Sequence, residues 1–226
     1  MGIPALCDML ATAGGVEAFR EAVANPAEKW ENPIGNIGAE NILITNAPAT
    51  PEAVGKRVSE YGEAKGLDGI AAFADLYSRN RGDMTDVRFN MSEDNVAKVY
   101  SHPKCLVGSD GLYTGGGEFS HPRAFATFPR YLGRFIRERK VLSLEEGIHR
   151  LTGQAAERYR IKGRGFIREG YDADVTVFDP ETVADRATYS DPFLPNEGIR
   201  CVILNGKIRA ENGTVSGEGN GKFLTW

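Results

Sequence analysis

Apolar residues recur at the spacing of an α-helix over several stretches of the first 160 residues. The stretches 15–24 (GVEAFREAVA) and 67–79 (LDGIAAFADLYSR) place large apolar side chains three or four positions apart, which is typical of an amphipathic helix. Capping residues and proline at a first helical position mark further helix starts. The helices predicted in this way cover residues 15–24, 51–65, 67–79, 92–102, 122–140 and 143–151.

Two short, continuous apolar runs interrupt these helices. The runs 41–45 (NILIT) and 105–108 (CLVG) are bounded by polar or turn-forming residues, which favours strands buried on both faces. Because helices lie between them, the pattern predicts a parallel strand-helix-strand arrangement of the α/β class.

The pattern changes near residue 160, where strands begin to dominate. The run 174–178 (DVTVF) alternates weakly, and 201–204 (CVIL) is joined to 207–210 (KIRA) by Asn205-Gly206, the pair most typical of a two-residue hairpin. We therefore expect an α/β part over residues 1–160 and a β-rich part over residues 161–226.

Composition narrows the class of partner. The 226 residues are 41% hydrophobic and 26% charged, as in an ordinary folded globular protein. Lys and Arg total 27 and Asp and Glu total 31, with both signs mixed along the chain, so the sequence predicts neither nucleic-acid nor membrane binding. No apolar stretch approaches the roughly 18 to 20 residues of a membrane span. A small soluble substrate is the expected partner.

Histidine and cysteine usage restricts metal chemistry. His102, His121 and His149 are too scattered for an H-x-H or H-E-x-x-H pair, so a self-contained multi-histidine metal site is not expected. The three cysteines lack a C-x-x-C spacing, which disfavours a disulfide framework and indicates a reducing cytoplasmic location.

The sharpest chemical feature is the sequence VGSDG at 107–111. It places Asp110 after an apolar run and between glycines, where a carboxylate serves as a metal ligand or a general base. The alternative is a residue of an Asx turn that only ends a strand.

A glycine-rich loop at 112–120 leads into His121-Pro122-Arg123. Proline fixes the backbone between the imidazole and the guanidinium, so both side chains could project into a pocket, with Arg123 pairing with a substrate carboxylate through two N–H groups. The alternative is that both pair with surface acids.

These motifs resemble a known family. VGSDG, the run HPRAFATFPRYLGRF, GYDADVTVFDP and VILNGK are similar to the C-terminal part of the D-aminoacylases, N-acyl-D-amino-acid deacylases of the amidohydrolase superfamily. The likeness runs from about residue 91 to 207 and continues more weakly back to the first predicted helix. GYDADVTVFDP and VILNGK are shared by many amidohydrolases, whereas HPR followed by TFPRYLGRF is specific to the deacylases.

The resemblance implies the C-terminal part of a zinc-dependent (β/α)8 barrel followed by a small β-sandwich. It implies that 41–45 is the seventh barrel strand and 105–111 the eighth. In the family, a water activated by the metal attacks the amide bond. By resemblance, Asp110 contacts the metal, takes a proton from that water and passes it to the leaving amine, while Arg123, with His121 beside it, binds the substrate carboxylate.

The departures from the family are as informative as the matches. Family members are about twice as long, and the H-x-H pair, bridging cysteine and single histidines of their N-terminal half have no counterpart here; Ala126 also stands where the family has glycine. We therefore expect little or no zinc binding and no activity from this chain alone. Homo-oligomerisation, or association with an N-terminal half, is expected to cover the open strand edges.

Two alternatives stay open at this stage. One is a non-catalytic half-barrel module, or the partner subunit of a separately encoded N-terminal chain. The other is a different amidohydrolase, of the hydantoinase or dihydroorotase type.

Overall fold

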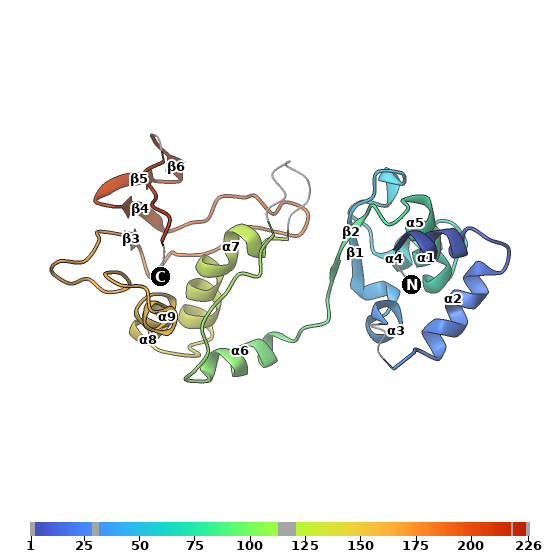
Figure 1. Ribbon diagram of the computed structural model, residues 1–226, viewed down its shortest axis with the longest axis horizontal. Coiled ribbons are helices and arrows are strands. Elements are labelled where there is room, and N and C mark those ends of the chain that lie inside the picture. The colour runs from blue at the N-terminus through green and yellow to red at the C-terminus, as the bar shows by residue number, and fades with distance from the viewer. Residues whose placement is uncertain (1–2, 29–31, 113–120, 218, 225–226) are drawn as a thin grey trace. The chain divides into compact units, whose positions relative to one another are not determined.

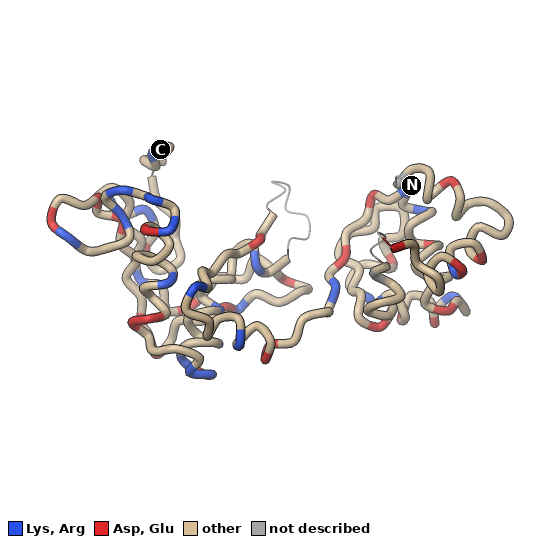
Figure 2. The backbone as a smooth tube through the Cα atoms, turned by 60° about the horizontal axis from the view of Figure 1, so that its bottom comes forward, with Lys and Arg blue, Asp and Glu red and all other residues tan. Residues whose placement is uncertain are grey.

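The computed structural model describes residues 3–28, 32–112, 121–217 and 219–224. These residues form two compact units, the first ending at Met91 and the second beginning at Ser92. Figure 1 shows the helices and the small sheets of each unit, and Figure 2 shows that acidic and basic residues are both present throughout the two units. The predicted boundary between an α/β part and a β-rich part, near residue 160, lies inside the second unit. That boundary concerns the barrel and the sandwich of the complete family fold, and it stays a prediction.

The first unit packs helices around a short strand. Its elements are α1 (Ile3–Leu10), α2 (Gly15–Ala24), α3 (Pro33–Ile37), η1 (Ala39–Asn41), β1 (Ile42–Asn46), η2 (Pro51–Ala53), α4 (Val58–Glu63), α5 (Gly69–Arg79) and β2 (Thr85–Arg88). Ile42 and Ile44 of β1 are fully buried, together with Leu76 of α5. Helix α2 has the bounds that its apolar spacing predicts, and α5 begins after Asp68, whose carboxylate accepts hydrogen bonds from two backbone N–H groups.

The prediction of a parallel strand pair is wrong. Strand β1 pairs antiparallel with β2, and residues 105–108 form no strand. On its other side β1 is bonded to the chain just after η2, where Ile44 N–H donates to Lys56 O at 2.9 Å. Both edges of β1 are therefore occupied locally, and residues 105–108 find no ladder partner among the described residues.

The predicted helix over 51–65 is also interrupted. The chain forms only the 3-10 turn η2 before Gly55, whose φ of 82° returns it toward β1, and α4 starts at Val58. The buried Asn80 amide holds this turn, because it donates to Thr50 Oγ1 and accepts from Ala49 N–H, each at 2.8 Å.

The second unit joins helices to an antiparallel sheet. Its elements are α6 (Glu93–Ser101), α7 (Arg123–Arg130), the π-helix η3 (Tyr131–Glu138), α8 (Leu144–Leu151), α9 (Gly153–Tyr159), β3 (Val175–Phe178), β4 (Ile199–Leu204), β5 (Lys207–Glu211) and β6 (Thr214–Val215). Tyr131 and Phe135 are buried, and the ring of Tyr100 on α6 meets each of them edge-on at 4.9 Å. The predicted helix over 122–140 is thus present, widened after Pro129 into a π-helix.

Buried Arg150 on α8 ties α6 to the rest of this unit. Its guanidinium donates to the carbonyl oxygens of Tyr100 and His102 at 2.7 and 2.5 Å, and to the Glu146 carboxylate at 3.0 Å. The arginine therefore satisfies carbonyls at the end of α6 that have no partner within the helix.

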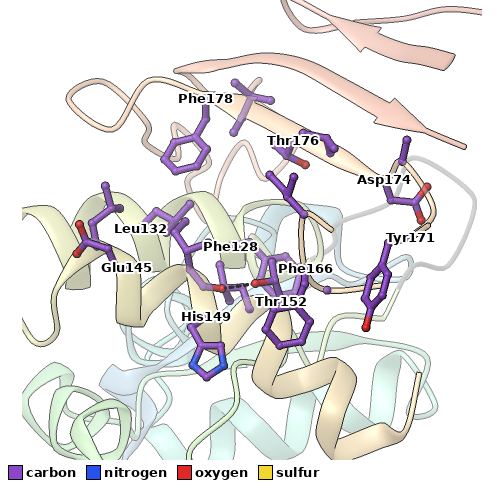
Figure 3. Close-up of a pocket in the computed structure, with 18 of the residues that line it drawn as sticks. Phe128, Leu132, Glu145, His149, Thr152, Phe166, Tyr171, Asp174, Thr176 and Phe178 are labelled. Carbon is purple, nitrogen blue, oxygen red and sulfur yellow. Dashed lines mark hydrogen bonds between the residues drawn. The ribbon is translucent and has the colours of Figure 1, made fainter. Parts of the chain in front are cut away.

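The sheet has the strand order β3-β4-β5-β6, and β3 and β4 lie above the helices in Figure 3. Asn205 and Gly206 have φ of 48° and 73°, so they form the predicted hairpin turn between β4 and β5. No residue of these four strands is buried. Most side chains of β3 and β4 are nevertheless apolar. Strand β3 has no ladder partner on its outer edge within the described residues.

Gly198, which precedes β4, lies close to the backbone of Val183, and a substitution at Gly198 tests this contact. Its φ is 75°, and a Cβ there would overlap the backbone nitrogen and Cα of Val183. We expect Gly198→Ala to lower the free energy of unfolding by about 3 kcal/mol, from left-handed strain and overpacking together. The matched control is Gly213→Ala, where φ is 82° and the space is open, so only strain of about 1 kcal/mol is expected. Denaturant titration compares the two variants, and equal losses would contradict the proposed overlap.

Among the described residues no helix is long and apolar enough to cross a bilayer.

Candidate active site

Asp110 lies in the irregular segment that follows α6. Its backbone is left-handed, with φ of 47°, a conformation that aspartate tolerates better than most residues. The turn around Asp110 is stabilised by the Ser109 side chain, because its Oγ accepts a hydrogen bond from Gly111 N–H at 3.2 Å. The Asp110 side chain is 86% exposed, so its carboxylate is available to a ligand.

Asp110 is paired with Arg123, the first residue of α7. Arg123 Nη2 lies 3.0 Å from Asp110 Oδ2. The two segments approach closely because Gly111 has no side chain: a Cβ there would lie 2.6 Å from Ala124 Cα. Two of the three predicted site residues are thus brought together by the glycine that follows Asp110.

His121 lies beside Arg123, and its imidazole is held by a hydrogen bond and by a ring contact. Its Nδ1 accepts a hydrogen bond from Arg123 N–H at 3.0 Å, and its ring meets the ring of Tyr189 edge-on at 5.3 Å. Burial lowers the pKa of His121, and the positive charge of Arg123 lowers it further, against a smaller opposite effect of Asp110. A neutral ring with an unprotonated Nδ1 is what the hydrogen bond requires.

The glycine-rich loop that the sequence places between Asp110 and His121 falls at 113–120, outside the described residues. Tyr189 was not predicted as part of the site, because it comes 68 positions after His121 and no spacing rule connects them. Its only sequence signal is its position within ATYSDPF, which the family resemblance includes.

We tested whether the side chains here suit a zinc ion. Within the described ranges no three His, Cys, Asp or Glu side chains lie close enough together to hold a metal. Asp110 therefore offers one carboxylate, whereas protein zinc sites take three or four protein ligands. The described residues do not by themselves form a zinc site.

A wide hollow in the second unit lies away from these residues. A cavity of about 940 Å³ opens between β3 and the helices η3 and α8, as Figure 3 shows. Apolar side chains dominate its wall, among them Leu132, Ile148, Phe166, Phe178 and Ile199. None of the three predicted site residues lines it, and it brings together segments that sequence patterns do not connect.

Comparisons with known proteins assign the family. The model of the amidohydrolase family matches residues 7–210. The chain belongs to the amidohydrolase family. Within it, the chain is similar to N-acyl-D-aspartate deacylase of Alcaligenes xylosoxydans xylosoxydans, with 39% identity over 186 residues, which cover 82% of this chain and 36% of the relative. The predicted resemblance to the D-aminoacylases is thereby confirmed.

Solved structures agree with this assignment. The crystal structure of N-acyl-D-glutamate deacylase from Bordetella bronchiseptica, complexed with zinc and a phosphonate mimic of the tetrahedral intermediate, matches with a TM-score of 0.68 and 36% identity. The match covers 78% of this chain and 36% of that one. A dihydroorotase of Lactobacillus acidophilus is also similar, with 27% identity. That match covers 48% of this chain and 24% of the dihydroorotase. The chain thus spans about a third of the length of its deacylase relatives.

Proposed function

We propose that this chain supplies the C-terminal part of an N-acyl-D-amino-acid deacylase active site, which hydrolyses the amide bond of its substrate. The observation that supports this most directly is the pair of Asp110 and Arg123, held 3.0 Å apart by two different segments. A carboxylate for proton transfer and a guanidinium for a substrate carboxylate are the two groups that such a reaction needs from this side of the site.

Each side chain has a defined task in the proposal. Asp110 takes a proton from the attacking water on a carboxylate oxygen and returns it to the nitrogen of the leaving amine. Arg123 binds the carboxylate of the acylated amino acid, with His121 beside it. Because Asp110 and Arg123 are 86% and 42% exposed, their ion pair is worth less than about 1 kcal/mol, and a substrate carboxylate can replace Asp110 at little cost.

Zinc enters the proposal only through the rest of the site. The deacylase relative from Bordetella was crystallised with zinc, but the described part of this chain brings no three possible metal ligands together. We therefore derive no step through a metal, and we propose that the remaining ligands come from polypeptide outside this chain, either an N-terminal half or a larger assembly that includes a second copy.

A cytoplasmic location is part of the same proposal, and the three cysteines, which are all free thiols, support it. A non-catalytic half-barrel module is the second candidate, because the described residues hold no complete metal site. A dihydroorotase-type activity has less support, because the deacylases match more of the chain at higher identity.

Complementation tests the proposal. The chain is mixed with the N-terminal two-thirds of the Alcaligenes N-acyl-D-aspartate deacylase in the presence of Zn²⁺, and release of D-aspartate from N-acetyl-D-aspartate is measured. We expect hydrolysis from the mixture and none from either part alone. A complex that forms on size-exclusion chromatography without hydrolysing this or other N-acyl-D-amino acids would favour the non-catalytic module.

Metal content gives a separate prediction for the isolated chain. After purification and dialysis against micromolar Zn²⁺, elemental analysis should find far less than one zinc per chain, because a single carboxylate binds the ion weakly. Near-stoichiometric zinc that Asp110→Ala removes would contradict the conclusion that the site is incomplete.

A further inference from the structure

The first turn of α7 is held from outside by a loop that the proposed chemistry does not use. This loop runs from Ala184 to Glu197, and its ends are joined by two backbone hydrogen bonds between these residues, at 2.9 and 3.3 Å. Near its tip, Thr188 and Asp191 bond to each other through Thr188 Oγ1 and through the backbone, each at 2.9 Å. The loop is therefore closed at its base and braced at its tip.

The closed loop contacts α7 at three points. The ring of Tyr189 meets His121 edge-on at 5.3 Å, and the ring of Phe193 meets Phe125 at 5.0 Å. Between them, the Asn196 side-chain amide donates to Phe125 O at 3.0 Å. These contacts fix the chain on both sides of Arg123.

His121 then passes this constraint to Arg123. Its Nδ1 accepts the Arg123 N–H at 3.0 Å, so the imidazole acts as a cap at the start of α7. Pro122, with φ of −48°, holds the backbone between them. The direction of the Arg123 side chain consequently depends on how the His121 ring is held.

We propose that His121 and Tyr189 are positioning residues: Tyr189 holds the His121 ring, and His121 Nδ1 holds the Arg123 backbone so that the guanidinium points toward Asp110. Resting on the proposed function, this assigns the two residues to aiming the group that binds the substrate carboxylate. The imidazole nitrogen that faces Arg123 is already occupied, so the contribution of His121 to substrate binding runs through Arg123.

Matched variants of the full chain separate the acceptor atom from the bulk of the ring. In His121→Asn, the amide oxygen takes the place of Nδ1 and preserves the hydrogen bond. In His121→Gln the acceptor is moved one bond further out. Tyr189→Phe keeps the edge contact of the ring, whereas Tyr189→Leu removes it.

Amide hydrogen exchange of Arg123, measured by NMR without substrate, gives the main readout. We expect exchange about five- to tenfold faster in His121→Gln, as loss of one hydrogen bond predicts, and a rate near wild type in His121→Asn. Tyr189→Leu should also accelerate exchange, and Tyr189→Phe should not. Wild-type exchange in His121→Gln, or equal acceleration in the asparagine and glutamine variants, would overturn the proposal.

The tautomer of His121 gives an independent readout. Its ¹⁵N shifts should show an unprotonated Nδ1 and a protonated Nε2 at pH 7.5, and the opposite tautomer would overturn the proposal.

The failure of the proposed function is distinguishable from the failure of this inference. N-acetyl-D-aspartate is added to the wild-type chain while the guanidinium signal of Arg123 is followed by NMR. A signal that does not move removes the support for carboxylate binding at Arg123, whereas the exchange rates and the tautomer still decide whether His121 and Tyr189 position it.

Discussion

Asp110→Ala is expected to reduce hydrolysis of N-acetyl-D-aspartate by at least about a hundredfold in the assembly formed with the deacylase N-terminal part. The reason is that a positioned general acid-base contributes about 10²- to 10⁴-fold to such a reaction. The steady-state rate is measured at saturating substrate, so that a change in binding does not mask a change in kcat. Because the Asp110 side chain is 86% exposed, its removal leaves the packing of the second unit intact.

Two controls sharpen this prediction. Asp110→Asn keeps the size and polarity of the side chain but cannot accept the proton, so it should lose about as much activity as alanine. Asp94→Ala removes another exposed carboxylate of the same unit, one that pairs only with Arg139 among the described arginines, and should retain activity. Retention of more than a tenth of the rate in both Asp110 variants would exclude the proton-transfer role.

Arg150→Met is expected to lower the free energy of unfolding by about 3 kcal/mol, since it removes the side-chain donor from the carbonyls of Tyr100 and His102 and leaves His102 O with only the N–H of Cys105. The arginine side chain is only 3% exposed, so water cannot readily replace it at these carbonyls. A loss of this size is a large fraction of the stability of an ordinary domain. The measurement is urea denaturation followed by the fluorescence or circular dichroism of the second unit.

The comparison for Arg150 is an arginine on the surface. Arg134→Met removes two surface ion pairs, one with Glu138 and one with Glu93 of α6, in which every side chain is more than 40% exposed, and it should leave the midpoint nearly unchanged. Arg150→Lys should fall between the two, because the ammonium retains the charge but reaches fewer carbonyls. Equal midpoints for Arg150→Met and Arg134→Met would show that the buried hydrogen bonds do not hold α6.

Local signals in the sequence predicted those elements that depend on local chemistry. Helix α2 follows its apolar spacing, Ser143 caps α8 by accepting from Glu146 N–H at 3.2 Å, and Asn205-Gly206 turns the hairpin. Each of these features is decided within a few residues, so tertiary structure had little to override.

The strands of the first unit depend on distant contacts, and there the prediction failed. Strand β2 has the sequence TDVR, in which only Val87 is apolar and buried. The hydrophobic pattern therefore did not predict β2 as a strand or as the partner of β1. Residues 105–108 have a strand-like sequence, but the described part of the chain offers them no ladder partner. A strand exists only where a second segment supplies its hydrogen bonds, and a linear pattern does not contain that information.

The site shows the same division. Asp110 and Arg123 were predicted from residue type and motif, and the close approach at Gly111 brings them together. The closed loop that carries Tyr189 could not be anticipated, because its contact with His121 bridges 68 positions.

The unburied sheet of the second unit also bears on the solubility of the protein. Among the described residues the outer edge of β3 has no ladder partner, so its backbone N–H and C=O groups form a template for pairing with other chains. Asp174 and Asp179 stand directly before and after this strand, where they pair with Arg164 and Arg200, so charged side chains flank this edge at both ends. These charged pairs at both ends of the strand therefore act as a barrier to aggregation through its edge.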